Sequence, residues 1–183
     1  MLILETPRLV LRPFEDADVE TFAAYRSDPK VAQYQSWETP FTLKQAAAFI
    51  DEMKRTQPGT IGAWYQLAVE RKQQAGLVGD CAFHILPHDA QQAEIGFTFA
   101  RPYQHQGYAT EAVMRLLDYL FNALSLHRVT AICDAENAAS AKLLERVGMR
   151  REGYFIDHIW FKGAWGSEYS YAILQREWKT RQS

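Results

Sequence analysis

The chain has 183 residues, of which 48% are hydrophobic and 23% charged, and its formal net charge is −2. This length suits one domain with a substantial core, so we expect a single domain over residues 1–183. A weakly negative chain has no general attraction for nucleic acid, which disfavours phosphate-backbone binding as its main function. No stretch approaches the roughly 20 apolar residues of a membrane span. The N-terminus, MLILE, lacks the basic region of a signal peptide, and we expect a cytoplasmic protein without a membrane partner.

The first half of the chain predicts a strand, two helices and three further strands. Thr42 and Gln45 have the spacing of a capping box, which marks the start of the second helix, and Pro58-Gly59 ends it. Alternating or continuous apolar runs indicate the strands. The expected elements are a strand at 8–14, helices at 15–27 and after Thr42, and strands at 65–69, 77–85 and 94–99.

The second half predicts a long helix, a strand, a short helix and a hairpin. Past Gly107, apolar residues recur at the i, i+3, i+4 spacing of a buried helical stripe: Val113, Leu116, Leu117, Leu120, Phe121 and Leu124. A buried strand is expected at 128–133, and Asn137 is a favoured cap for a helix that ends at Gly148. Strands at 154–161 and 169–174 form the hairpin across 162–166. The order predicts a mixed α/β sheet covered by helices.

The loop before the long helix has the features of an anion site. A glycine at a strand-to-helix junction lets the backbone approach a ligand, and the first turn of the helix leaves N–H groups unpaired at its positive end. A diphosphate is the natural guest of such a site. On spacing alone, Gly107 is equally compatible with a plain turn.

Neither the cysteines nor the histidines indicate a reactive or metal-binding cluster. Cys81 and Cys133 lie in apolar strand-like runs, so we expect buried thiols, with a disulfide or a nucleophile as the alternative. The five histidines lack the spacing of metal ligands, and no metal site is expected.

Several motifs together resemble those of the GNAT (Gcn5-related) N-acetyltransferases, nearly from end to end. The segment Gln104 to Ala109, after a Glu-x-Gly-Phe strand, resembles the acyl-CoA diphosphate loop. The segments at 6–13, 31–37, 137–149 and 168–174, followed by Trp178, resemble the branch that contains the ribosomal-protein N-terminal acetyltransferases. The resemblance implies one N-acetyltransferase domain, with a mostly antiparallel mixed sheet, flanking helices and a splayed central strand pair.

The resemblance also implies the reaction and the cofactor-binding residues. An acetyl group would move from acetyl-CoA to a primary amine, of a protein N-terminus or a small molecule, by direct attack in a ternary complex and without a metal. The expected cofactor-binding residues are Phe97, Thr98 and Phe99 for the pantetheine arm, Gln104, His105, Gln106, Gly107, Tyr108, Ala109 and Thr110 for the diphosphate, and Asn137 and Ser140.

The resemblance makes Glu94 the expected general base, because it occupies the position of a strand glutamate that faces the acceptor amine. The alternative is a surface glutamate in an ion pair. For Asn137 and Ser140 the alternative to a functional role is helix capping. Many members of the family place a tyrosine on this helix to protonate the departing thiolate, whereas this chain has Leu143-Leu144. The general acid is therefore open among Ser140, another tyrosine and solvent.

The acceptor itself stays open in the sequence. Tyr34 and Trp37 either line the acceptor pocket or pack on the sheet. The aromatic residues of the late hairpin favour packing in the core or in a homodimer over base stacking: Tyr154, Phe155, Trp160, Phe161 and Trp165. A rival interpretation is a GNAT-fold sensor that binds acyl-CoA without turnover. A P-loop or dinucleotide site is disfavoured, because no Gly-Lys-Ser/Thr follows the loop and glycines are few.

Overall fold

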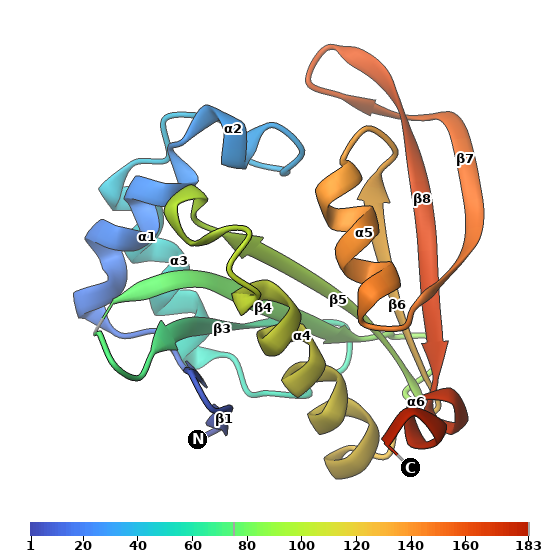
Figure 1. The fold of residues 1–183 in the computed structure, drawn as a ribbon. Coiled ribbons are helices and arrows are strands. Elements are labelled where there is room, and N and C mark those ends of the chain that lie inside the picture. Colours follow the sequence, from blue (N-terminus) through green and yellow to red (C-terminus); the bar gives the residue numbers. More distant parts are fainter. Residues whose placement is uncertain (75, 183) are drawn as a thin grey trace.

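The computed structural model describes residues 1–74 and 76–182, and within them eight strands form one sheet in the order β1-β2-β3-β4-β5-β6-β8-β7 (Figure 1). Every neighbouring pair is antiparallel except β5 and β6, which confirms the mixed, mostly antiparallel sheet. The strands are β1 Leu4–Glu5, β2 Leu9–Arg12, β3 Trp64–Arg71, β4 Leu77–Ile85, β5 Gln92–Phe99, β6 Arg128–Asp134, β7 Arg150–Phe161 and β8 Ala164–Leu174.

Six α-helices accompany the sheet in the described part of the chain. They are α1 Val19–Arg26, α2 Pro29–Ala32, α3 Leu43–Arg55, α4 Tyr108–Asp118, α5 Ala138–Arg146 and α6 Gln175–Gln182. Short 3-10 turns precede α1 and α4, and a π-helical turn at Tyr119–Ala123 continues α4. No helix among the described residues is long and apolar enough to cross a membrane.

The central strands β5 and β6 part after a short shared segment. They pair in parallel only from Gln92–Arg128 to Glu94–Thr130, although β5 continues to Phe99 and β6 to Asp134. Figure 1 shows the two strands diverging from this shared end. The splayed strand pair is therefore confirmed, and the backbone of β5 beyond Glu94 is left without a strand partner on its β6 side.

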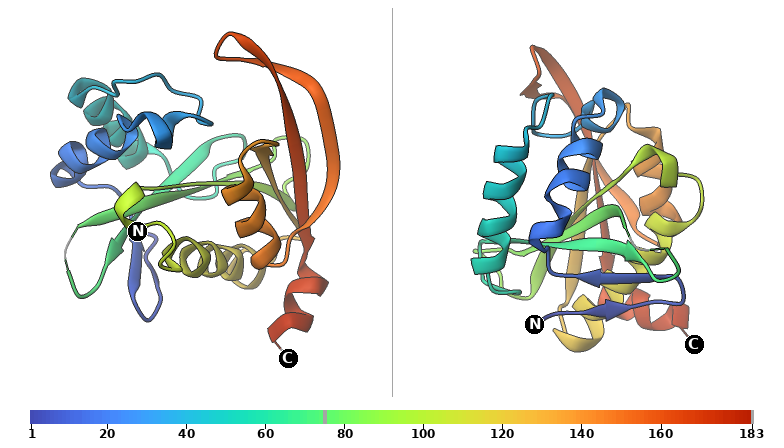
Figure 2. Two further views of the ribbon diagram at one scale, coloured as in Figure 1. Left: turned by 45° about the horizontal axis from the view of Figure 1, so that its top comes forward. Right: turned by 90° about the vertical axis from the view of Figure 1, so that its left-hand side faces the viewer.

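Helices cover both faces of the sheet, and each covering layer has its own apolar core (Figure 2). On one face, α4 and α5 pack against inward residues of β2 to β6, and the predicted stripe from Val113 to Phe121 is fully buried there. On the other face, α1 and α3 enclose Phe22, Ile50 and Ala68. Because alternate strand residues face opposite sides, Leu67 and Val69 belong to the first core and Ala68 to the second.

The predicted helix ends are confirmed by their hydrogen bonds. Thr42 Oγ1 accepts from the Gln45 N–H at 3.2 Å, and Gln45 Oε1 accepts from the Thr42 N–H at 2.8 Å, which completes the capping box. Asn137 Oδ1 accepts from the Ser140 N–H at 3.1 Å at the start of α5. Gly148 ends this helix with φ +96°, a left-handed conformation in which a Cβ is strained.

The structure corrects the expected hairpin. Its strands are longer than expected, and the turn consists of Lys162 and Gly163 alone, with φ +48° and +87°. A two-residue turn in which both φ values are positive follows the right-handed twist of the paired strands. The two strands therefore stay paired up to Phe161 and Ala164, next to the turn. Strand β1 and helices α2 and α6 were also not expected, because each is short or weakly patterned.

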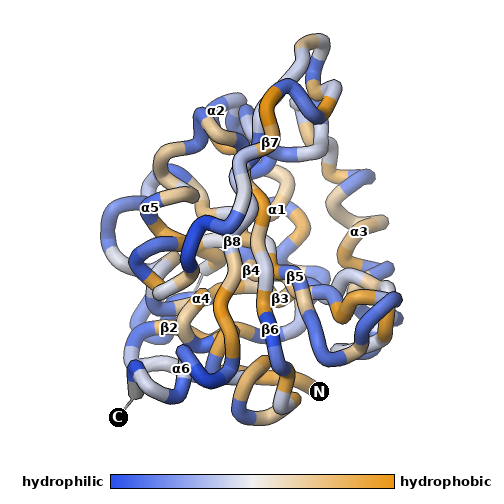
Figure 3. Tube along the Cα trace, turned by 90° about the vertical axis from the view of Figure 1, so that its right-hand side faces the viewer, coloured by the Kyte–Doolittle hydropathy of each residue, from blue (hydrophilic) through white to orange (hydrophobic). Residues whose placement is uncertain are grey.

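The aromatic residues of this hairpin do not form part of the core of the chain. Tyr154, Phe155, Trp160 and Trp165 are all exposed, and Trp160 and Trp165 pack on each other with ring centroids 5.5 Å apart. Figure 3 shows the hairpin reaching beyond the body of the protein. Core packing is therefore the wrong interpretation for these four residues, and their packing in a homodimer stays a prediction.

Candidate active site

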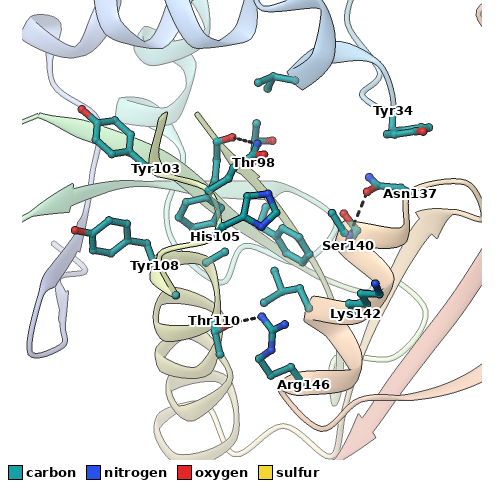
Figure 4. Close-up of a pocket in the computed structure, with 18 of the residues that line it drawn as sticks. Tyr34, Thr98, Tyr103, His105, Tyr108, Thr110, Asn137, Ser140, Lys142 and Arg146 are labelled. Carbon is teal, nitrogen blue, oxygen red and sulfur yellow. Dashed lines mark hydrogen bonds between the residues drawn. The ribbon is translucent and has the colours of Figure 1, made fainter. Parts of the chain in front are cut away.

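A cavity of about 600 Å³ opens between α4 and α5, next to the point where β5 and β6 part (Figure 4). Most of the sequence-predicted site residues line it together: Tyr34, Phe97, Thr98, Phe99, Gln104, His105, Gly107, Tyr108, Ala109, Thr110, Asn137 and Ser140. Three predicted residues do not line it, namely Gln106, Trp37 and Glu94. The structure thus brings residues from four segments of the chain to one cavity.

The loop before α4 presents unpaired N–H groups to this cavity. Gly107 is the N-cap with φ +81°, and the first bond of the helix runs from the Glu111 N–H to the Gly107 carbonyl. The N–H groups of Tyr108, Ala109 and Thr110 therefore have no intrahelical partner. They lie at the positive end of the helix dipole, where an anion is stabilised.

Side chains inside the loop hold its shape. Gln104 Nε2 donates to the Phe99 carbonyl at 2.9 Å, and Gln106 Nε2 donates to the Pro102 carbonyl at 2.7 Å. The side chain of Gln106 is thus engaged by a backbone carbonyl of the loop, which explains why it does not line the cavity.

An arginine near the N-terminus braces the same loop. Arg8 Nη1 donates to the Gln106 carbonyl at 3.0 Å, and Arg8 Nε pairs with Glu111 Oε2 at 2.6 Å. The guanidinium also lies 4.6 Å from the centre of the Tyr108 ring. Arg8 was expected only as part of the first strand, and this role was missed because about 100 residues separate it from its partners.

The positions of Asn137 and Ser140 are compatible both with helix capping and with a role at the cavity. The side-chain oxygen of Asn137 is used for capping, while both side chains line the cavity. The Ser140 hydroxyl has no hydrogen bond to any described residue, so its proton is available to a ligand. Leu143 and Leu144, which stand where the family often has a tyrosine, are buried in the core.

Three basic side chains for which no role was predicted also line the cavity: Lys30, Lys142 and Arg146. No aspartate or glutamate is among the described lining residues. The positions of Lys142 and Arg146 could have been predicted from the sequence. Together with Ala139 they have the i, i+3, i+7 spacing of one helix face.

Glu94 lies on β5 at the last residue paired with β6, on the opposite face from the α4–α5 layer. Its neighbours Ala93 and Ile95 point into that layer, whereas Glu94 stands beside His84 on β4. It is half-buried, and no hydrogen bond or ion pair to a described residue compensates its charge. Burial, and then the nearby charge of Glu168, raise the pKa of Glu94.

The two residues proposed for the acceptor side differ in position. The Tyr34 side chain lines the cavity, with its hydroxyl 3.5 Å from the Glu136 carbonyl. Trp37 packs elsewhere, because its Nε1 donates to the Arg26 carbonyl at 2.9 Å and its ring covers the Arg26 guanidinium at 4.0 Å. Trp37 therefore contributes to the α1–α3 layer.

The cysteines are free and buried, as expected. Burial raises the pKa of Cys133 to about 11, mainly by desolvation, and that of Cys81 well above its usual value. Both thiols are therefore protonated at neutral pH, which disfavours a nucleophilic role. No group of three or more metal-ligating side chains occurs among the described residues.

Residues 8–150 match the family described as the acetyltransferase (GNAT) domain. The chain belongs to the GNAT acetyltransferase family. It is 35% identical over 175 residues to YnaD of Bacillus subtilis, named as an N-acetyltransferase, and the match covers 96% of this chain and 98% of YnaD. It is also similar to the [Ribosomal protein uS5]-alanine N-acetyltransferase of Escherichia coli, with 22% identity covering 96% and 92% of the two chains.

Solved structures agree with this assignment. A GNAT-family acetyltransferase from Bacillus anthracis has a TM-score of 0.84 and 35% identity to this chain, with 96% of this chain and 99% of that one covered. The chain is thus an acetyl-CoA-dependent N-acetyltransferase, and the resemblance found in the sequence is confirmed.

The GNAT cofactor fits the residues that this chain provides. Position 107 of the loop carries no side chain, and the first turn of α4 offers unpaired N–H groups. Among its described lining residues, the cavity holds only basic charges. Acetyl-CoA carries about four negative charges and a long pantetheine arm, and an elongated cavity lined by basic side chains suits both features.

Proposed function

We propose that the protein acetylates a primary amine, of a protein N-terminus or a small molecule, by direct attack on acetyl-CoA within a ternary complex. The observation that carries this proposal is the position of Glu94, an uncompensated carboxylate at the point where β5 leaves β6. The cofactor cavity is lined largely by the loop before α4 and by helices α4 and α5, which pack on one face of the sheet, and Glu94 stands on the other face. The gap between the strands is where the two substrates would meet.

The cofactor would be held from the loop to the start of α5. The N–H groups of Tyr108 to Thr110 would bind the diphosphate, and the backbone of β5 from Phe97 to Phe99, which has no strand partner on its β6 side, would pair with the pantetheine arm. The side-chain amide of Asn137 would donate a hydrogen bond to the same arm. The bound cofactor supplies an activated thioester, so the protein is left to orient the substrates and move protons.

Glu94 would take the proton from the amine, directly or through a water molecule. The nitrogen forms a bond to the acetyl carbon, the C–S bond breaks, and the proton leaves the amine for the carboxylate. A carboxylate with an ordinary pKa is a weak acceptor for an ammonium. The raised pKa of Glu94 makes it a stronger base than a solvated glutamate, which favours this step.

The departing thiolate also needs a proton. Ser140 lines the cavity with an uncommitted hydroxyl, whereas Leu143 and Leu144 can supply none. We therefore assign the general-acid role to Ser140, with its proton restored from solvent.

Replacing Glu94 by glutamine tests the proposal, since Glu94→Gln keeps the shape and removes the base. General-base catalysis is worth about 10²- to 10⁴-fold, so kcat should fall at least about a hundredfold while the Kd for acetyl-CoA stays unchanged. The exposed Glu20 on α1 provides the matched control, and Glu20→Gln should retain full activity. If Glu94→Gln keeps most of its rate, Glu94 only positions the amine and solvent takes the proton.

A further inference from the structure

Two large apolar side chains stand exposed on the sheet face that carries Glu94. Trp64, at the start of β3, is 42% exposed, and Ile132 on β6 is 47% exposed. Their chain neighbours Tyr65 and Cys133 point into the core under α4, so Trp64 and Ile132 point to the opposite face, as Glu94 does. Helices α1 and α3 cover this face at the other end of β3. The two apolar side chains are therefore open to a ligand that approaches Glu94.

The Trp64 ring reaches across the sheet toward Glu94. Trp64, His84 and Glu94 are direct partners on three neighbouring strands, and the indole packs on the His84 imidazole with ring centroids 4.9 Å apart. Gly96 follows Glu94 by two residues on the same face of β5, and a Cβ at this glycine would lie 3.9 Å from Trp64 Cζ3. The ring thus extends from β3 over β4 to β5 and forms a wall beside Glu94.

Strand β6 supplies a second apolar surface on the other side of Glu94. Thr130 is the strand partner of Glu94, and Ile132 is the next residue of β6 on the same face, where the two strands part. Binding sites for small molecules combine apolar walls with a few polar groups that fix the orientation of the ligand. A carboxylate between two apolar surfaces has this composition.

Two other carboxylates lie on this face, and each already has a partner. His158 Nδ1 lies 3.0 Å from Glu168 Oε2, and Asp134 Oδ1 accepts from the Glu136 N–H at 2.7 Å. Glu94, in contrast, has no hydrogen bond or ion pair with a described residue. Among these three carboxylates, one negative charge is thus left to a ligand, which favours an acceptor with a single ammonium over a polycation.

We propose that the acceptor is a primary amine on an apolar body, aromatic or branched aliphatic, which packs against the Trp64 ring while the nitrogen faces Glu94. The inference rests on the proposed function, in which Glu94 takes the proton of the amine. The same chemistry occurs in a free arylalkylamine and in a peptide whose N-terminal residue is apolar. Trp64 is then a specificity-determining residue, because it contacts the acceptor away from the reacting nitrogen.

A purely structural role for Trp64 makes a different prediction. If the indole only covers His84, its removal lowers the melting temperature and leaves the acceptor kinetics unchanged. If it binds the apolar body, the contact is equally strong in the ground state and the transition state, so its loss raises KM and leaves kcat unchanged.

Steady-state thiol release from acetyl-CoA with 2-phenylethylamine, ethylamine and 1,4-diaminobutane tests the inference. Ethylamine lacks the apolar body, and 1,4-diaminobutane replaces it with a second cation. The wild-type kcat/KM should be at least about tenfold higher for 2-phenylethylamine than for the other two, as expected for burial of a phenyl ring. Two tripeptides, with phenylalanine or serine at the N-terminus, form the second arm. The phenylalanine peptide should be preferred by a similar factor, and its rate relative to 2-phenylethylamine shows whether the source is a polypeptide or a small molecule.

Variants of Trp64 separate the two roles. Trp64→Ala should raise the KM for 2-phenylethylamine about tenfold to a hundredfold, with kcat, the Kd for acetyl-CoA and the ethylamine kinetics unchanged. Trp64→Phe should restore most of the loss, because it keeps an aromatic ring. Met114 on α4 is 41% exposed and belongs to the layer on the opposite face of the sheet, so Met114→Ala is the matched control and should keep the wild-type preference.

Two outcomes would overturn the inference while leaving the proposed function intact. One is a wild-type kcat/KM for 1,4-diaminobutane or the serine peptide that equals or exceeds the value for its apolar counterpart. The other is an unchanged KM for 2-phenylethylamine in Trp64→Ala, which would leave Trp64 with the structural role alone. If no amine or peptide releases thiol with the wild-type protein, although acetyl-CoA binds, the proposed function is wrong and the inference fails with it.

Discussion

Substitution of Gly107 tests the cofactor loop, and two variants separate its contributions. Gly107→Gln and Gly107→Glu introduce side chains of the same shape, which differ by one carboxylate charge. Both must adopt φ +81°, and a left-handed conformation costs a residue with a Cβ about 1–2 kcal/mol. Both also place a Cβ 3.2 Å from Arg8 Nη2, whose exposed end can move aside. We expect equal losses in melting temperature, about 2–8 °C.

The affinities of the two variants should differ far more than their stabilities. A carboxylate about 5 Å from one diphosphate charge is repelled by about 3 kcal/mol at an effective dielectric constant near 20. That energy corresponds to roughly a hundredfold in Kd, in addition to the steric loss shared with glutamine. Gly107→Glu should therefore show no measurable binding of CoA.

Calorimetric titration with CoA, beside thermal unfolding of each free variant, provides both quantities. If the glutamate variant remains folded and binds CoA like the wild type, the diphosphate does not lie over Gly107. If the two variants bind equally weakly, steric intrusion alone explains the loss, and the electrostatic reasoning is wrong.

Two further predictions concern the proton and the sheet. Because the charge of Glu168 helps to raise the pKa of Glu94, Glu168→Gln should lower that pKa and move the acidic limb of kcat/KM to lower pH; an unmoved limb would mean that another group titrates there. Gly79→Ala should destabilise the protein by about 1–3 kcal/mol in urea unfolding, because its Cβ would lie 2.2 Å from the Thr98 carbonyl oxygen, whereas Gly96→Ala, with its nearest contact at 3.9 Å, should be nearly neutral. Equal effects of the two alanines would contradict the close approach of β4 and β5.

Local patterns in the sequence predicted the parts of the site that depend on neighbouring residues. The apolar stripe after Gly107 fixed the buried face of α4, and Asn137 marked the start of α5. Both follow from helix geometry and capping chemistry, which act within a few residues. The loop was therefore expected in its correct place, although a glycine at a helix start could not by itself separate an anion site from a plain turn.

The missed features depend on contacts between distant segments. Arg8 braces a loop nearly 100 residues away, and Arg146 reaches Thr110 from another helix, so neither partner is visible in a local pattern. Trp37 packs on the buried guanidinium of Arg26, which lies eleven residues earlier at the end of α1. The hairpin turn was expected to be longer than it is, because Lys162, an ordinary residue, adopts a positive φ there.

Release of free thiol from acetyl-CoA, measured with a panel of amines, tests the central claim most directly. The panel should include N-terminal peptides, polyamines, amino acids and aminoglycosides. The wild-type protein is predicted to release thiol in an amine-dependent way with at least one acceptor class, and Glu94→Gln at least about a hundredfold more slowly. If the protein binds acetyl-CoA and yet releases no thiol above the rate of hydrolysis with any amine, it is a sensor of acyl-CoA and not an enzyme.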